Sequence, residues 1–306
     1  MSNVLLGTCI GDALGMPFET LLPNNPQLIN WDGVSFLPSI HHKLKAGMYT
    51  DDGQLSIIVA ESLISNSGFN PDDLAQRYLA WMKSGNARGF GKTTLLAMQN
   101  LESGKHWTSS GVVGSYGNGT AMRAAPFGVY FRNDLRALVS IVKTDSAITH
   151  VSEDAEAGAI AIALAAAYAV NQDTDDLLEK ICEQLPNSKV KNTIYSLGSL
   201  INSDCITAEQ SLRVLGTRAN VRETVPAALY CFLKFDNYID AVRTIIRSGQ
   251  DCDTNAAITG ALFAAKDGIK NIPKHLIDQI ENRDCLFKLD SQLYNRTSYS
   301  FFPRSI

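Results

Sequence analysis

Two short acidic stretches, far apart in the chain, carry the residues best suited to chemistry. YTDDGQLS sets two aspartates directly after a threonine, and DCDTNAA sets two aspartates around a cysteine and before a threonine. Hard divalent cations such as Mg²⁺ and Mn²⁺ bind oxygen ligands almost exclusively, so four carboxylates and two threonine oxygens suit them. If the two stretches meet in the folded chain, repulsion between the carboxylates favours one or two bound cations. The six candidate ligands are Thr50, Asp51, Asp52, Asp251, Asp253 and Thr254.

Each acidic stretch also has an ordinary structural interpretation. A threonine followed by acidic residues is a common helix start, because the hydroxyl caps free backbone amides and the carboxylates favour the positive end of the helix dipole. Both stretches lead into runs of small and apolar residues, as a helix start would. Either stretch alone therefore leaves both interpretations open, and their separation in the folded chain decides.

A glycine-rich segment supplies candidate groups for binding an anion. SYGNGTAMRAAPFG places Gly117 and Gly119 around Asn118, with Arg123 in the run that follows. Glycines let backbone amides come close to phosphate oxygens, although GNG is also an ordinary turn. Arg123 suits a phosphate or a buried carboxylate partner, and we favour the structural role. His150 precedes an expected helix start, where an imidazole either donates to an anion or is simply buried.

Helical periodicity extends over most of the chain. Segment 70–85 begins with an Asn–Pro cap and repeats its apolar residues with the helical period. Segment 152–170 begins with a serine cap, and segment 207–216 begins with a threonine–glutamine capping box. Alternating strand patterns are nearly absent, and segment 23–48, with three prolines, is expected to be a long loop. We therefore predict an all-α fold, one compact multi-helix domain over residues 1–306, in which Ala and Gly let helices approach closely.

Composition and charge argue against several classes of function. Hydrophobic residues make up 45% of the 306 residues and charged residues 19%, which favours a large core over disorder. The net charge of −4 lacks the basic excess typical of nucleic-acid-binding proteins. Six cysteines without CxxC spacing indicate reduced thiols rather than disulfides or a zinc site. The N-terminal segment lacks a signal-peptide pattern, and the most apolar segment, 155–170, is too short to span a bilayer. We expect a soluble, cytoplasmic protein without membrane contact.

Five stretches, in this order along the chain, resemble the ADP-ribosylglycohydrolase family, the ADP-ribosyl-acceptor hydrolases that include the dinitrogenase-reductase-activating glycohydrolase. They are GTCIGDALGMPFE, YTDDGQLS, SYGNGTAMRAAPFG, ITHVSEDAEAGAIA and DCDTNAAITGALFAA, and they run from residue 7 to about residue 265. Each stretch alone is a weak signal, but the ordered set is specific and covers most of the chain.

The resemblance implies an all-α fold with a binuclear Mg²⁺ or Mn²⁺ centre at the bottom of a cleft. It gives the metal ligands as the six residues of the two acidic stretches. Glu19 is similar to the family's metal-proximal acid, and His150 is similar to the family histidine that contacts the ADP-ribose phosphate. Segment 23–48 would be the substrate-side flap. The diphosphate would lie on Ser115, Tyr116, Gly117, Asn118 and Gly119.

Two positions depart from the family pattern. Gly53 stands where the family commonly has threonine, and Gln250 stands where a glycine pair commonly precedes the aspartate. Gly53 would loosen the helix start that aims the first acidic pair. These changes bear on rate and substrate preference more than on metal binding.

The expected reaction is hydrolysis of the glycosidic bond between ADP-ribose and an acceptor, with two Mg²⁺ (or Mn²⁺) as cofactors. Glu19, Asp51, Asp52 and Asp253 are the expected catalytic carboxylates. The partner would be an ADP-ribosylated protein or a small ADP-ribose conjugate. We favour arginine as the acceptor, while serine, acetyl and nucleic-acid-base linkages stay open, as does the oligomeric state.

Two other classes of function compete with this one. A non-catalytic ADP-ribose-binding or crystallin-like family member would be free to lose its metal ligands, but all six positions keep acidic or hydroxyl side chains. A two-metal phosphoesterase uses similar oxygen-rich sites, but such enzymes usually add histidine ligands.

Overall fold

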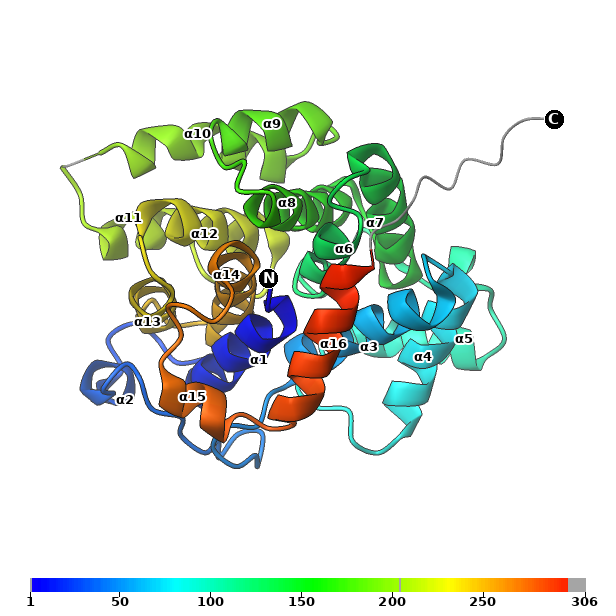
Figure 1. Ribbon diagram of the computed structural model, residues 1–306, viewed down its shortest axis with the longest axis horizontal. Helices are drawn as coiled ribbons and strands as arrows, with labels where there is room; N and C mark the ends of the chain where they lie inside the picture. The colour runs from blue at the N-terminus through cyan, green and yellow to red at the C-terminus, as the bar shows by residue number, and fades with distance from the viewer. Residues whose placement is uncertain (1, 204, 297–306) are drawn as a thin grey trace.

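Helices dominate the computed structural model, which describes residues 2–203 and 205–296 (Figure 1). The described strands are β1 (Val112–Val113) and β2 (His150–Val151), which pair in parallel. The predicted all-α fold is confirmed. In chain order the helices are α1 (Val4–Gly15), the 3-10 helix η1 (Met16–Phe18), α2 (Pro26–Asn30), α3 (Asp51–Asn66), α4 (Pro71–Lys83), α5 (Lys92–Glu102), the 3-10 helix η2 (Trp107–Ser109), α6 (Ala125–Tyr130), α7 (Leu135–Thr149), α8 (Glu153–Val170), α9 (Leu177–Gln184), α10 (Lys189–Ile201), α11 (Ala208–Leu215), α12 (Val221–Lys234), α13 (Tyr238–Arg247), α14 (Cys252–Asp267), α15 (Lys274–Gln279) and α16 (Arg283–Asn295).

The predicted helix starts are present. Asn70 accepts hydrogen bonds from the backbone amides of the first turn of α4, and Ser152 accepts one at the start of α8. Thr207 and Gln210 form the expected capping box of α11. The alanine-rich α8 is buried along nearly its whole length and forms the floor against which α6 and α7 pack.

Helices α1 and α14 lie antiparallel at the centre of the molecule, one near each end of the chain (Figure 1). Their backbones touch because glycines line the facing side of α1. A Cβ on Gly11 would lie 2.2 Å from the carbonyl oxygen of Ala256, closer than any real contact. The predicted role of small residues in close helix packing is therefore confirmed. The antiparallel arrangement brings the beginning of α14 to the end of α1.

The long loop 23–48 is less irregular than the sequence indicates. It contains the short helix α2 and an isolated bridge between Ser39 and Leu44. Trp31 of this loop packs on Phe18 with ring centroids 5.1 Å apart, which fixes the loop against η1.

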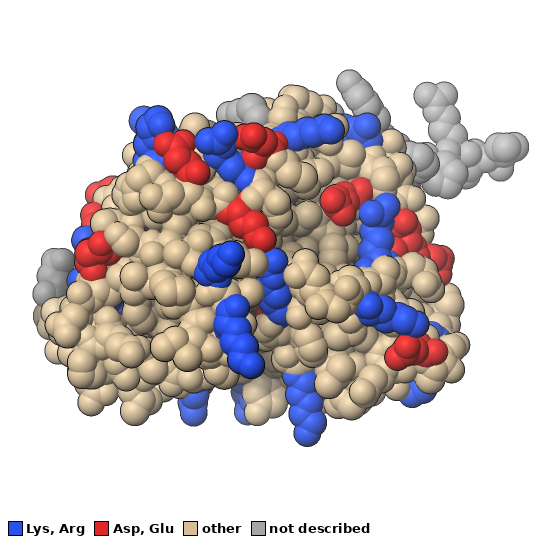
Figure 2. Space-filling view, turned by 90° about the horizontal axis from the view of Figure 1, so that it is seen from below, with Lys and Arg blue, Asp and Glu red and all other residues tan. Residues whose placement is uncertain are grey.

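The surface and the thiols also bear on the sequence predictions. On the face drawn in Figure 2, basic and acidic side chains lie next to one another in several places, and a few Lys and Arg side chains gather near the middle. All six cysteines are free thiols, as predicted. Within the part of the chain that the structure describes, none of the helices has the length and apolar character that a bilayer span requires.

Candidate active site

The two acidic stretches begin two helices whose first turns lie together. α3 begins at Asp51, and α14 begins directly after Asp251. The hydroxyl of Thr254 donates to Asp52 Oδ2 at 3.4 Å, so the two turns are joined directly. The distance between the two stretches, which the sequence left open, is therefore short. Neither Thr50 nor Asp251 caps its helix with its own side chain.

Two groups of three carboxylates form where these turns meet. Oxygens of Asp12, Asp52 and Asp253 all lie within 4.8 Å of one another. The same holds for oxygens of Glu19, Asp251 and Asp253. Because Asp253 belongs to both groups, the carboxylates form one continuous cluster with an arrangement able to hold metal ions.

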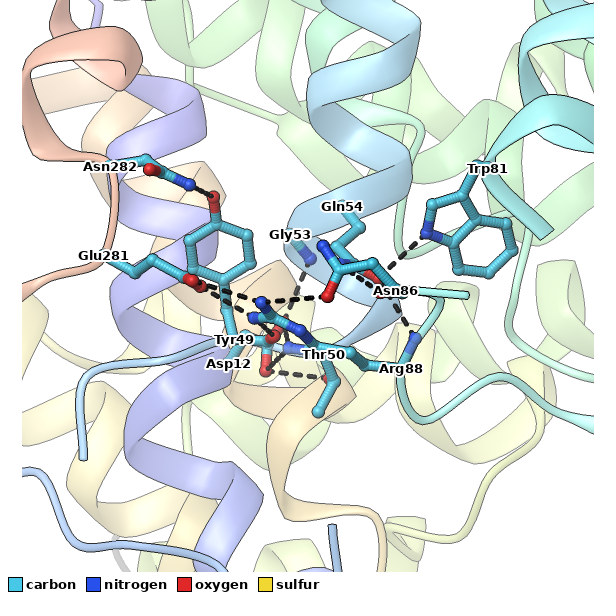
Figure 3. A network of polar contacts seen from close by, with 10 residues as sticks. All are labelled: Asp12, Tyr49, Thr50, Gly53, Gln54, Trp81, Asn86, Arg88, Glu281 and Asn282. Carbon is cyan, nitrogen blue, oxygen red and sulfur yellow. Dashed lines mark hydrogen bonds and ion pairs between the residues drawn. The ribbon is translucent and has the colours of Figure 1, made fainter. Parts of the chain in front are cut away.

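Asp12 of α1 positions the first acidic pair (Figure 3). Its carboxylate accepts hydrogen bonds from the Thr50 amide at 2.9 and 3.0 Å and from the Thr50 hydroxyl at 2.9 Å. It also accepts one from the Gly53 amide at 3.0 Å. A side chain from α1 therefore does the capping that the sequence assigned to Thr50, whose own hydroxyl does not cap α3.

Gly53 is tightly packed at this helix start. A Cβ on Gly53 would lie 2.6 Å from the ring of Tyr49 and 3.0 Å from Cys9 Sγ. Arg88 fixes the segment that leads into α3, because its guanidinium donates to the Tyr49 carbonyl oxygen and to Glu281 (Figure 3). The expected loosening by Gly53 has no counterpart in this geometry.

Burial dominates the protonation of the cluster. It raises the pKa of Asp51, Asp52 and Asp253 well above the ordinary range, and repulsion between carboxylates raises these pKa values further. Burial also raises the pKa of Asp12 and Asp251 to about 6, although the hydrogen bonds that they accept oppose the shift. A cation among these oxygens would favour their ionised forms, so its binding would release protons near neutral pH.

Asp52 has a carboxylate oxygen with no protein partner. Its Oδ2 accepts a hydrogen bond from the Thr254 hydroxyl at 3.4 Å and also lies 3.4 Å from the Thr50 hydroxyl, whose proton goes to Asp12, but its Oδ1 is buried without a partner among the described residues. A buried charged oxygen left unpaired is costly. The oxygen-only donor set and this unpaired atom fit a hard divalent cation.

Glu19 is held beside the second acidic stretch by the backbone. The Thr20 amide donates to the Gln250 carbonyl oxygen, and the Gln250 amide donates to the Leu21 carbonyl oxygen, both at 2.6 Å. Gln250 adopts a φ of 68°, a left-handed conformation that favours glycine. Gln250, where the chain departs from the family pattern, therefore has a strained backbone conformation within the site. The carboxylate of Glu19 lies 2.5 Å from Nε2 of His42, which comes from the long loop.

The glycine-rich segment lies against His150. A Cβ on Gly117 would lie 3.1 Å from His150 Nε2, and a Cβ on Gly119 would lie 3.0 Å from Cε1, so the imidazole packs closely against the backbone of both glycines and would have to shift by a few tenths of an ångström to admit a larger residue. Between them, Asn118 donates to Asp251 and, at 3.0 Å, to Thr224. Asn118 therefore connects the glycine-rich segment to the acidic cluster.

The hydrogen bonds around His150 fix its tautomer. Arg123 is a donor only, and its Nη2 donates to Thr149 Oγ1 at 2.9 Å. Thr149 Oγ1 lies 2.8 Å from His150 Nδ1 and has no other acceptor among the described residues, which favours donation of its one proton to Nδ1. Burial and the Arg123 charge lower the pKa of His150 to about 3, so the ring is neutral. Its single N–H is therefore at Nε2, beside Gly117.

Arg123 has the structural role favoured from the sequence. It is fully buried and pairs with Asp145 at 3.0 Å. Its Nη1 also donates to the carbonyl oxygen of Gly119 at 3.0 Å. One guanidinium thus holds the glycine-rich segment and, through Thr149, the orientation of His150.

A pocket of about 270 Å³ connects the acidic cluster to the glycine-rich segment. At one end it exposes Glu19 and carboxylates of the two acidic stretches, and at the other it exposes Gly117, Asn118, Gly119 and His150. Ser115 and Tyr116 lie outside its lining. Ser115 pairs with the hydroxyl of Thr93, and the ring of Tyr116 is covered by the guanidinium of Arg222 at 4.0 Å. Thr50 and Asp52 are buried and are not part of the pocket lining.

Comparison with known proteins fits this arrangement. The sequence matches the ADP-ribosylglycohydrolase family over residues 2–300. The chain belongs to the ADP-ribosylglycohydrolase family. As a member, it is a hydrolase of the ADP-ribosylglycohydrolase type that acts on glycosyl bonds. A solved ADP-ribosylglycohydrolase-related protein complex has the same fold, with a TM-score of 0.79 at 24% identity and 97% of each chain covered.

Three relatives of this family member show how far the likeness extends. A protein of Archaeoglobus fulgidus without a functional name is 31% identical over 295 residues, covering 95% of each chain. The ADP-ribosylarginine hydrolase Tri1 of Serratia proteamaculans is 26% identical and covers 95% of this chain and 78% of its own. The ADP-ribosylhydrolase ARH3 of Xenopus tropicalis is also 26% identical and covers 88% and 87%.

Sequence reasoning missed three parts of this site. Asp12 carried a usable signal, since a carboxylate in the last turn of a mostly apolar, buried helix must find buried donors. His42 was given no role, and nothing in its local sequence indicates the contact with Glu19. The first turn of α5, which also lines the pocket, lies in a segment where no motif was recognised.

Proposed function

We propose that this enzyme removes mono-ADP-ribose from an arginine side chain of a modified protein, in a reaction that depends on two Mg²⁺ or Mn²⁺ ions. One observation carries the proposal: a single pocket has a buried carboxylate cluster at one end and a glycine-rich, histidine-bearing wall at the other. A ligand that fits has hydroxyl groups for cations at one end and an anionic group at the other. ADP-ribose has both. We further propose that the whole chain acts as one catalytic domain.

The residues that would hold the cations are those of the two acidic stretches. Bound divalent cations supply electrostatic stabilisation and increase the acidity of a neighbouring water. The cluster suits this role because its carboxylates lie on the rigid first turns of α3 and α14 and because Asp52 Oδ1 has no partner among the described residues. The proposed ligands are Thr50, Asp51, Asp52, Asp251, Asp253 and Thr254.

Glu19 is the proposed general base. Cleavage of a glycosidic bond builds positive charge on the sugar, so a proton must leave the attacking water as it bonds to the anomeric carbon. Glu19 lines the pocket and lies beside Asp251 and Asp253. Its pairing with His42 fixes its orientation at the pocket edge. The proton of the water would pass to Glu19, and the acceptor would leave with the bonding electrons and take up a proton from Glu19 or from solvent.

The glycine-rich wall is the proposed diphosphate site. The His150 Nε2–H and the backbone around Gly117 and Gly119 would supply donors for the diphosphate, and Asn118 between them connects this wall to Asp251. Binding the diphosphate away from the reacting carbon orients the ribose toward the acidic cluster. Ser115 and Tyr116, which lie outside the pocket lining, would support this wall from behind.

Arginine is the proposed acceptor because relatives over nearly the whole chain bear the name ADP-ribosylarginine hydrolase. Arginine-, serine- and acetyl-linked ADP-ribose substrates, each assayed with Mg²⁺, with Mn²⁺ and with EDTA, test the proposal. We expect release of free ADP-ribose that is fastest from arginine and is abolished by EDTA. Replacement of Asp51, Asp52 or Asp253 by alanine should abolish release. Binding of ADP-ribose without any turnover would instead indicate the non-catalytic alternative.

A further inference from the structure

A second group of possible metal ligands lies where the long loop 23–48 meets Glu19. One side-chain atom from each of Glu19, His41 and His42 lies within 4.8 Å of the other two. The two imidazole rings meet edge to face, with their centroids 4.7 Å apart. These three residues, the histidine group, offer two nitrogens and one oxygen, whereas the carboxylate cluster offers oxygens alone.

The backbone holds both histidines on one tight turn. Ser39 and Leu44 exchange two backbone hydrogen bonds, at 3.0 and 3.2 Å, and so close the turn that carries the two rings. Within this turn the His42 amide donates to the Ser39 hydroxyl at 3.2 Å. Because the turn is already formed, little conformational freedom is lost when its side chains converge on an ion.

The ligand types of the histidine group differ from those that Mg²⁺ prefers. Imidazole nitrogen suits Zn²⁺ and other late first-row transition metals, and two histidines with one glutamate are a known zinc ligand set that keeps an open position. Tetrahedral zinc places its ligand atoms about 3.3 Å apart, so the three atoms must move somewhat closer together. The side chain of His41 is exposed and has room to turn toward an ion.

The surroundings favour a cation at this position. A cavity of about 530 Å³ is lined by both Glu19 and His41, so a hydrated ion has a path to the histidine group. The carboxylate of Glu19 also lies within 4.8 Å of oxygens of Asp251 and Asp253, and their negative charge attracts cations.

We propose that Glu19, His41 and His42 form a transition-metal site, separate in ligand type from the carboxylate cluster, and that Zn²⁺ bound there inhibits the enzyme. The ion would replace the proton between His42 Nε2 and the Glu19 carboxylate, which lie 2.5 Å apart, and this proton would go to solvent. The inhibition rests on the proposed function. A Glu19 carboxylate bound to Zn²⁺ is a much weaker base, so it would not take the proton of the attacking water.

Calorimetric titration of the full chain with Zn²⁺, in the presence of saturating Mg²⁺, tests the site. We expect His41→Gln to weaken the binding of one Zn²⁺ by about 100-fold, because loss of a ligand costs at least as much as loss of a group that supports one. His106→Gln is the matched control, since His106 Nε2 also lies near a carboxylate, 3.3 Å from Asp72. This variant should bind Zn²⁺ as the wild type does.

Release of ADP-ribose in the presence of Mg²⁺ tests the inhibition. Zn²⁺ should inhibit the wild type and His106→Gln, whereas His41→Gln should stay active at the same Zn²⁺ concentration. Equal Zn²⁺ affinity in the wild type and His41→Gln would overturn the inference, and so would equal inhibition of the two. Failure of the proposed function is distinguishable: the wild type would then release no ADP-ribose even without Zn²⁺, while the calorimetric difference would remain.

Discussion

The tautomer of His150 gives the sharpest test of the site, and Thr149 is the residue to change. In the wild-type protein the Thr149 hydroxyl accepts from Arg123 and donates to His150 Nδ1, so the ring proton is at Nε2. Thr149→Val keeps the size and shape of the side chain but removes the hydroxyl. In this variant residue 149 has no hydroxyl to donate to His150 Nδ1, so the ring proton of His150 is free to occupy either nitrogen.

The expected size of the effect follows from two limits. If the two tautomers become equal in energy, half of the molecules keep the Nε2–H, and the affinity for ADP-ribose falls about twofold. Complete removal of this donor, as in His150→Leu, costs a hydrogen bond to a charged group, about 1.5–3 kcal/mol, or roughly 10- to 150-fold in affinity. Thr149→Ser keeps the hydroxyl and should behave as wild type.

The measurement is the ¹⁵N chemical shift of both His150 ring nitrogens, with calorimetry of ADP-ribose binding on the same samples. In the wild type and Thr149→Ser we expect one protonated nitrogen, Nε2, and one unprotonated nitrogen, Nδ1. In Thr149→Val the two shifts should move toward each other. A wild-type spectrum with the proton on Nδ1 would refute the argument, because the direction of the Arg123–Thr149–His150 chain would then be wrong.

Four further predictions address the supports of the site. Asp12→Ala should lower stability by about 2–4 kcal/mol because it strands the buried Thr50 and Gly53 amides, whereas Asp12→Asn should cost less; equal melting temperatures would contradict the capping role. Gly11→Ala should cost about 1–3 kcal/mol in chemical unfolding by separating α1 from α14. Gln250→Gly should raise the melting temperature slightly, by relieving about 1 kcal/mol of left-handed strain. His150 has a pKa of 6.5 when unfolded and about 3 when folded, so the unfolded state takes up its proton first and up to about 5 kcal/mol of stability is lost as pH falls from 6.5 toward 3; an imidazole that titrates near pH 6.5 in the folded protein would contradict this.

Helix starts and the recognised motifs were predictable from the sequence because they depend on local chemistry. Ser152, Thr207 and Gln210 cap the helices that follow them, and their spacing alone shows it. The same local rule gave a wrong detail at Thr50, because the helix start there is capped by a side chain from another helix.

The remaining features depend on contacts between distant segments. The pairing of Glu19 with His42 joins η1 to a loop without periodicity, and no spacing indicates it. The contact between the Tyr116 ring and Arg222, which lies far along the chain, is also indicated by no spacing, and the diphosphate role of Tyr116 stays a prediction. The sequence of the first turn of α5 indicates only a helix start. That Thr94 lies beside the glycine-rich wall depends on contacts between distant segments, which no local pattern predicts.

The central pairing of α1 with α14 also constrains how the protein acquires its activity. The carboxylate cluster needs side chains from both helices, and Asp290 of α16 additionally accepts from the Leu5 and Leu6 amides at the start of α1. Contacts between such remote segments close long loops and therefore tend to form late in folding. Cations should consequently be captured only in the last stage of maturation, and a partly synthesised chain should be unable to concentrate them.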